Sequence, residues 1–177
     1  MSLDLKLRGA IREIKDYPKP GINFKDIVPI LANPALVSEI LDAQVAHWKD
    51  QSIDAVAGIE ARGFIFGSLL AHALNLPFIP VRKVGKLPYE RITQEYSLEY
   101  GTASIEMHTD ALQPGWHVLV HDDLLATGGT AAATGDLVNR LGGHVAGFSF
   151  LINLGFLPGS KLLKERFHSD PFFLVEF

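Results

Sequence analysis

The chain has 177 residues with 16 basic and 20 acidic side chains, a formal charge of −4 and no cysteine. This length fits one domain over residues 1–177, the acidic balance argues against nucleic acid binding, and the lack of cysteine excludes disulfides and thiol chemistry. No apolar run approaches the roughly 20 residues of a membrane span and Met1 to Arg12 lack a signal-peptide core, so we expect a cytoplasmic protein that binds no membrane.

The first part of the chain predicts two helices separated by a loop. Ser2 is a suitable N-cap for the first helix, and Pro18 and Pro20 end it. The apolar side of this helix consists of Leu3, Leu7, Ala10, Ile11 and Ile14. After a loop that contains Phe24, Asn33-Pro34 supplies the N-cap and first residue of the second helix. The inward positions of the second helix are Val37, Ile40, Leu41, Val45 and Trp48.

The rest of the chain alternates strands and helices, which predicts a parallel sheet with right-handed crossovers. Two segments that meet at Gly101-Thr102 alternate apolar and polar residues and predict a β-hairpin. The fold class is therefore α/β, with a central, mostly parallel sheet flanked by helices. The expected elements are strand 53–57, helix 62–74, strand 78–81, hairpin strands 95–100 and 103–108, strand 118–120, a helix ending at Gly142-Gly143, strand 144–153 and an edge strand in 172–177.

The segment from Val118 to Thr130 joins an apolar strand, two acids and a loop of small residues. Asp122 and Asp123 follow the strand at its carboxyl end, where open α/β sheets bind ligands. The next loop leads into a helix, whose first N–H groups and two threonine hydroxyls form a cradle for an anion. The acids suit ribose hydroxyls and, through water, a divalent cation. Together these features predict a site for a sugar that carries a phosphate.

Each part of this segment has an ordinary structural explanation when it stands alone. A Gly-Gly pair after a strand is usually a turn, and an Asp-Asp pair is usually a solvated loop. The ordered combination is more specific, although it is neither a Walker loop nor a dinucleotide fingerprint, because no Lys follows the glycines and the Gly-x-Gly-x-x-Gly spacing is absent.

Two further segments at strand ends favour an anionic ligand. The loop from Gly58 to Gly63 also leads from a strand into a helix, and the guanidinium of Arg62 suits a diphosphate. A surface ion pair between Glu60 and Arg62 is the alternative. The basic residues Arg82, Lys83 and Lys86 follow the next strand and suit the same charge, whereas a solvated basic surface is the alternative.

The motif of two acids, two apolar residues and Ala-Thr-Gly-Gly-Thr resembles the signature of the type I phosphoribosyltransferases, and its exact form is similar to that of the adenine-using branch. The similarity continues in the family's order through residues 20–27, 58–64, 81–88 and 96–101. It covers nearly the whole chain and implies the family's fold, with a small N-terminal hood over about residues 1–33 and a mobile hairpin loop over about residues 86–107.

The resemblance also implies a reaction, in which adenine and 5-phosphoribosyl 1-diphosphate (PRPP) give AMP and diphosphate. It implies Mg²⁺ as cofactor, held mainly by PRPP and water, and a homodimer. The residues that it assigns to the ribose and 5′-phosphate are Asp122, Asp123, Ala126, Thr127, Gly128, Gly129 and Thr130. Those that it assigns to the diphosphate are Glu60, Ala61, Arg62, Lys83 and Lys86, with a cis peptide between Glu60 and Ala61.

For the base, the resemblance implies that the Phe24 ring stacks on the purine, with Leu154 on the opposite face. The main chain of Asn23 and Lys25 would read the edge of the purine. By the same resemblance Glu99 is the catalytic acid/base residue, because a carboxylate can take the purine proton and offset a cationic ribose. Tyr100 would belong to the closing loop.

The sequence departs from the common family pattern at three places. Glu60-Ala61 stands where many relatives have Asp-Ser, Lys25 stands where Arg is frequent, and His121 replaces an apolar residue. We interpret His121 as a core histidine and not a catalytic one. The alternative functions are a phosphoribosyltransferase for xanthine, guanine, hypoxanthine or orotate, a ligand-sensing regulator with this fold, and a silent sugar-phosphate binding module.

Overall fold

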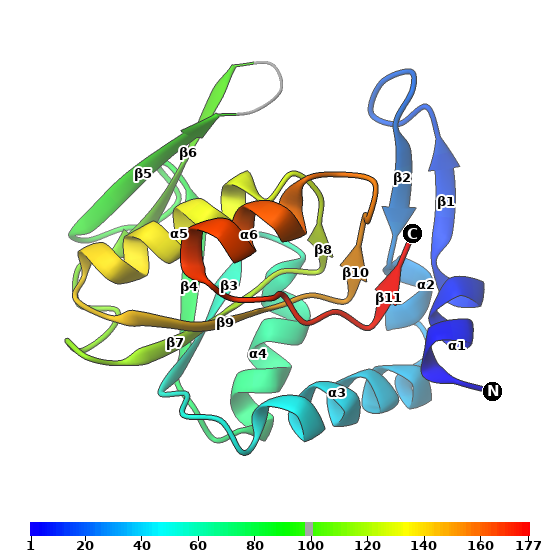
Figure 1. Cartoon of the computed structure of the whole chain (residues 1–177), viewed down its shortest axis with the longest axis horizontal. Helices are drawn as coiled ribbons and strands as arrows, with labels where there is room; N and C mark the ends of the chain where they lie inside the picture. Colours follow the sequence, from blue (N-terminus) through cyan, green and yellow to red (C-terminus); the bar gives the residue numbers. More distant parts are fainter. Residues whose placement is uncertain (98–100) are drawn as a thin grey trace.

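A six-stranded mixed sheet forms the centre of the molecule, as the α/β prediction requires. The computed structural model describes residues 1–97 and 101–177 (Figure 1). The sheet strands are β3 Ala55–Ile59, β4 Phe78–Lys83, β5 Arg91–Ser97, β6 Thr102–His108, β7 His117–His121 and β9 His144–Ser149. Their order is β5-β6-β4-β3-β7-β9, in which β4, β3, β7 and β9 are parallel and β5 and β6 form an antiparallel hairpin beside β4.

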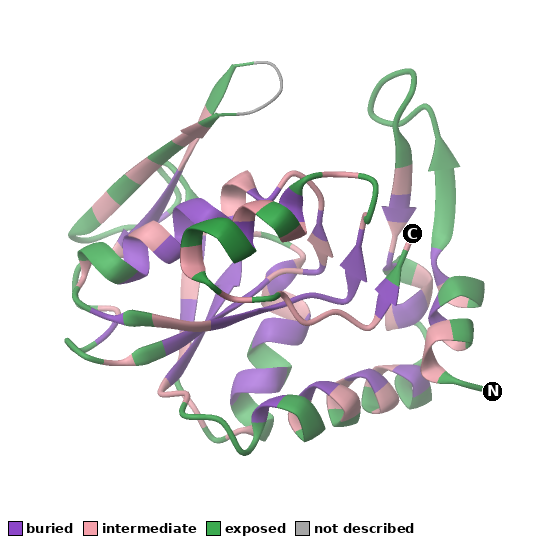
Figure 2. Cartoon of the chain, in the orientation of Figure 1, coloured by how far each residue is buried: buried purple, intermediate pink, exposed green. Residues whose placement is uncertain are grey.

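Helices cover both faces of the parallel strands. The helices are α3 Pro34–Trp48, α4 Gly63–Ala73, α5 Gly129–Arg140 and α6 Gly159–Phe167. Ala57 of β3 shares one buried cluster with Leu137 of α5, whereas the preceding residue, Val56, shares another with Trp48 and Leu70. Successive side chains of a strand point to opposite faces, so β3 is buried on both sides (Figure 2). This explains why the central strands are continuous apolar runs.

The hood expected over about residues 1–33 packs against short strands from the middle and the C-terminal part of the sequence. The elements of the hood are α1 Leu3–Ala10, β1 Arg12–Lys15, β2 Asn23–Asp26 and α2 Val28–Leu31, and the short strands are β8 Leu124–Leu125, β10 Ile152–Asn153 and β11 Val175–Glu176. Leu7 and Ile30 share a buried cluster with Ile152 and Val175. Strand β8 follows β7 after two residues and belongs to the small sheet β11-β10-β8. The carboxyl end of β7 therefore leads directly to the hood.

Several helix and strand boundaries were predicted well. The side chain of Ser2 accepts a hydrogen bond from Leu5, and that of Asn33 accepts one from Leu36, so both predicted N-caps are confirmed. The helix 62–74 is confirmed within one residue at each end, and the strand expected at 53–57 lies at Ala55–Ile59. The hairpin is confirmed as the antiparallel pair β5 and β6, although residues 98–100 of the predicted first strand lie outside the described residues. No helix within the described ranges is long and apolar enough to cross a membrane.

The N-terminal segment differs from the prediction. The first helix ends at Ala10 and does not reach Ile14, because residues 12–15 pair with residues 23–26 and Ile14 lies opposite Phe24. The expected loop around Phe24 is therefore strand β2. Pairing with a distant segment overrides the helical spacing of the apolar residues.

The C-terminal segment also differs from the prediction. The strand expected over 144–153 is divided, because β9 belongs to the large sheet and β10 to the small one. Helix α6 was not predicted. In the tail only Val175–Glu176 forms a strand, and it lies at the edge of the small sheet, beside β10.

Candidate active site

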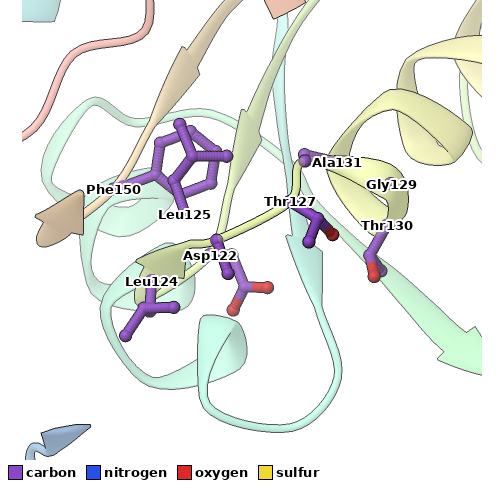
Figure 3. Close-up of a pocket in the computed structure, with 10 residues that line it drawn as sticks. Asp122, Leu124, Leu125, Thr127, Gly129, Thr130, Ala131 and Phe150 are labelled. Atoms are coloured by element: carbon purple, nitrogen blue, oxygen red, sulfur yellow. The ribbon is translucent and has the colours of Figure 1, made fainter. Parts of the chain in front are cut away.

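The loop between β8 and α5 forms a hollow at the start of the helix (Figure 3). Gly128 has a φ of +82°, and a Cβ there would lie 3.0 Å from the Cα of Gly159, so the turn requires glycine. The helix begins one residue later, and its first N–H groups have no acceptor within the helix. A cavity of about 90 Å³ lies at this turn. The predicted residues that line it are Asp122, Ala126, Thr127, Gly128, Gly129 and Thr130.

The two acids after β7 have different surroundings. Asp123 is buried with its Oδ2 3.1 Å from Nε of Arg62, whereas Asp122 is half-buried and lines the cavity. The Asp123 N–H donates to Oδ1 of Asp122 over 2.8 Å. Burial raises the pKa of Asp122 and the charge of Asp123 raises it further, while burial raises the pKa of Asp123 against the opposing charge of Arg62. Hydroxyl donors from a ligand would stabilise the charged form of Asp122.

A second loop leads from β3 into α4 beside the first. The peptide between Glu60 and Ala61 is cis, at the position that the resemblance implies. Oε2 of Glu60 accepts hydrogen bonds from Nε of Arg82 over 2.9 Å and from the N–H of Lys83 over 3.1 Å. A Cβ on Gly63 would lie 2.9 Å from Oδ1 of Asp122, so the two loops pack closely. Both loops therefore lie at the same edge of the sheet.

A second cavity, of about 120 Å³, lies between the two loops. Asp122 and Thr130 line both cavities, so the two cavities adjoin at these residues. Within the described residues, the lining of the second cavity includes Lys83 and not Lys86, which is exposed in the same turn. Its lining residues are Ile59, Glu60, Val81, Lys83, Tyr96, Ile105, Asp122 and Thr130.

Arg62 reaches from the second loop to the hood. Its Nη1 donates to the carbonyl oxygen of Lys25 over 3.1 Å, and its guanidinium carbon lies 4.9 Å from the centre of the Phe24 ring. Its Nε makes the ion pair with Asp123. Sequence reasoning assigned Arg62 to the diphosphate and did not find these contacts, because they join segments that are far apart in the chain.

The hood strand β2 presents main-chain groups away from its partner β1. The carbonyl of Lys25 accepts from Arg62, and main-chain groups of alternate residues in an antiparallel pair face the same side. Asn23 therefore faces the same way as Lys25. The Lys25 side chain is buried, forms an ion pair with Glu13, and lies 3.8 Å from the centre of the Phe177 ring. Its charge is thus held away from the open edge of the strand.

The remaining predicted residues lie partly outside the described ranges. Leu154 is half-buried in the hood cluster, and its N–H donates to the carbonyl of Leu125 over 2.9 Å. Glu99 and Tyr100 lie outside the residues that the structure describes. Tyr96, which sequence reasoning did not select, lines the second cavity, and a Cβ on Gly129 would lie 3.3 Å from its ring.

His121 is fully buried at the end of β7. Among the described residues, neither of its ring nitrogens has a hydrogen-bond partner. Burial lowers the pKa of His121 to about 3. The imidazole is therefore neutral at physiological pH.

Comparisons with known proteins agree with this geometry. Residues 28–169 match the family described as phosphoribosyl transferase domain. The adenine phosphoribosyltransferase of Myxococcus xanthus is 52% identical over 161 residues, which cover 90% of this chain and 88% of that protein.

Solved structures give the same result. The crystal structure of adenine phosphoribosyltransferase from Rhodothermus marinus has a TM-score of 0.93 and 49% identity, covering 99% of this chain and 98% of that one. The APRTase of Giardia lamblia complexed with 9-deazaadenine has a TM-score of 0.92 and 34% identity, and the match covers 100% of this chain and 98% of that one. The chain therefore belongs to the phosphoribosyltransferase family and, within it, to the adenine phosphoribosyltransferases.

Proposed function

We propose that this chain transfers the phosphoribosyl group of PRPP to adenine and releases diphosphate. The observation that carries the proposal is that Asp122 and Thr130 line both cavities, one at the phosphate cradle and one beside Glu60 and Lys83. A ribose at Asp122 would extend its 5′-phosphate into the first cavity and its diphosphate into the second. Related proteins are named for the same reaction.

In this arrangement both anionic ends of PRPP lie beside positive charge. The 5′-phosphate lies at the partial positive charge of a helix start, and the diphosphate lies beside lysine side chains. The helix start at Gly129 offers N–H donors to the 5′-phosphate, and Asp122 accepts from the ribose hydroxyls. The diphosphate lies beside the Glu60-Ala61 peptide, with Lys83 and Lys86 as the clamp. Arg62 neutralises Asp123 and connects the ribose side of the site to the base side.

Adenine binds against the hood. Its ring stacks on Phe24, with Leu154 on the other face, and the purine edge faces the main chain of Asn23 and Lys25. A carbonyl there accepts from the 6-amino group, and the N–H of Lys25 donates to N1. Hypoxanthine places an oxygen against the carbonyl and an N–H against the N–H of Lys25. Mismatches of this kind support a kcat/KM for adenine that is about 10⁴–10⁵-fold above that for hypoxanthine.

The chemical step exchanges one bond at the anomeric carbon for another. The bond from this carbon to the diphosphate oxygen breaks as the bond to N9 of adenine forms, and the N9 proton is lost. Glu99 receives that proton and offsets the positive charge that develops on the ribose. The resemblance assigns Tyr100 to the closing loop, whose role would be to exclude water.

The Mg²⁺ that the resemblance implies would be held mainly by PRPP and water. Within residues 1–97 and 101–177, no group of three or more His, Asp or Glu side chains could hold a metal ion. The half-buried Asp122 carboxylate can contact a hydrated cation through water. Mg²⁺ bound to PRPP would neutralise the charge of the leaving diphosphate.

The test is turnover with PRPP, Mg²⁺ and a panel of adenine, hypoxanthine, guanine, xanthine and orotate, measured as diphosphate release. Adenine should have a kcat/KM that is about 10⁴-fold or more above that of hypoxanthine. Equal values would contradict the choice of adenine, and no release with any base would contradict the transferase function. Phe24→Ala should raise the adenine KM through lost stacking, whereas Asn23→Val should preserve adenine preference because the contact uses the main chain.

By family resemblance we also propose a homodimer in the cytoplasm. Light scattering coupled to size-exclusion chromatography measures the mass directly and should give twice the 19.4 kDa of one chain. The monomer mass at micromolar concentration would contradict the dimer.

A further inference from the structure

Glu106 is a fully buried carboxylate that the proposed mechanism does not use. It lies on β6, where it is paired in register with Arg82 of β4 and Thr93 of β5. Burial of a charged carboxylate costs free energy unless hydrogen-bond donors surround it. The donors of Glu106 therefore identify the segment that this carboxylate holds in place.

Among the described residues, the side chain of Glu106 accepts its hydrogen bonds from the short segment between Lys86 and Arg91. Oε1 accepts from the N–H of Lys86 over 3.0 Å and from that of Leu87 over 2.7 Å, and Oε2 accepts from Nε of Arg91 over 2.9 Å. Burial by itself raises the pKa of Glu106, but the N–H donors of Leu87, Gly85 and Lys86 and the charge of Arg91 outweigh it, so its pKa lies below the usual range. The carboxylate is therefore charged at neutral pH.

The same segment is held from its other side. The carbonyl oxygen of Lys86 accepts from Nη1 of Arg82 over 3.0 Å, and Nε of Arg82 donates to Glu60. Glu60 also accepts from the N–H of Lys83. The main chain from Lys83 to Lys86 is thus fixed between Glu106 and Glu60, and Glu60 and Lys83 line the second cavity.

We propose that Glu106 is a positioning residue for diphosphate, because it fixes the turn of residues 83–87 that carries Lys83 and Lys86 next to Glu60. This inference rests on the proposed function, which places the diphosphate of PRPP in that cavity. Glu106 touches no substrate and acts through the N–H groups of the turn. Its loss should weaken the diphosphate half of the site and leave the phosphate cradle and the hood intact.

The test compares Glu106→Gln with the wild type. Calorimetric titration with inorganic diphosphate and Mg²⁺ should give a Kd that is about tenfold higher in the variant, because charge-assisted bonds to the turn are lost. The KM for PRPP should rise by a similar factor. Titration with AMP, which occupies the cradle and the hood, should give a Kd within about twofold of the wild type, as should the adenine KM.

Asp136→Asn is a matched control. Asp136 accepts from Nη2 of Arg166 over 2.6 Å and its side chain is 19% exposed, so the variant also breaks a carboxylate–arginine pair, but on α5 and away from the turn. It should bind diphosphate and AMP as the wild type does. If Glu106→Gln fails to fold, Arg91→Gln removes the cationic partner of Glu106 instead. This variant should also raise the Kd for diphosphate and leave the Kd for AMP unchanged.

An unchanged Kd for diphosphate in Glu106→Gln, with or without a fall in Tm, would overturn the proposal. Equal weakening of diphosphate and AMP would also overturn it, because Glu106 would then stabilise the fold as a whole. A different result tests the proposed function: it would be contradicted if the wild type released no diphosphate from PRPP in the presence of adenine.

Discussion

His121 should make the stability of the protein fall as the pH falls, and His121→Leu should remove that dependence. The imidazole is fully buried, its ring nitrogens lack hydrogen-bond partners among the described residues, and its pKa falls from 6.5 to about 3. A histidine whose pKa is lowered by folding binds a proton better in the unfolded chain. Protonation below about pH 6.5 therefore favours unfolding, until the folded pKa is reached.

The size of the effect follows from the two pKa values. Between about pH 7.5 and pH 5.5 the unfolded histidine gains nearly one proton and the folded one gains almost none, so the free energy of unfolding decreases by about 1.4 kcal/mol. At lower pH the loss continues at up to about 1.4 kcal/mol for each further pH unit.

Urea unfolding of the wild type and of His121→Leu at the two pH values measures this difference. The change in free energy of unfolding between the two pH values should be about 1.4 kcal/mol smaller in the variant. His121→Gln cannot be protonated either and should show the same loss of pH dependence, which separates charge from packing. Parallel curves of stability against pH for all three proteins would refute the reasoning.

Asp122→Asn removes the charge that would accept from the ribose hydroxyls, so kcat/KM for PRPP should fall by on the order of tenfold to a thousandfold, and wild-type kinetics would contradict this role. Glu99→Gln should slow the single-turnover rate by roughly 10²–10⁴-fold without weakening PRPP binding, and an unchanged rate would leave Glu99 without a catalytic role. Gly128→Ala introduces a side chain at a φ of +82° and should lower the free energy of unfolding by about 1–3 kcal/mol, measured in urea. Equal stability of the two proteins would mean that the turn tolerates a Cβ.

The sequence alone determined the central strands and the phosphate cradle. The strand before Asp122, the glycines after it and the helix that follows are adjacent in the chain, so local apolar spacing and helix-start chemistry are sufficient to predict them. The N-caps at Ser2 and Asn33 were predictable for the same reason. The resemblance added the roles of the residues, and the comparisons support the family that it implied.

The tertiary structure alone decided the features that depend on distant pairing. Residues 12–15 have helical spacing but form a strand, because residues 23–26 lie beside them. Arg62 meets Lys25 only because the hood packs over the second loop. Glu106 lies in a strand whose alternating apolar and polar residues are typical of a half-exposed strand. Its burial depends on hydrogen bonds from the turn of residues 83–87 and from Arg91. These contacts join residues that the folded chain brings together, and no local pattern of side chains encodes which partner will satisfy a buried charge.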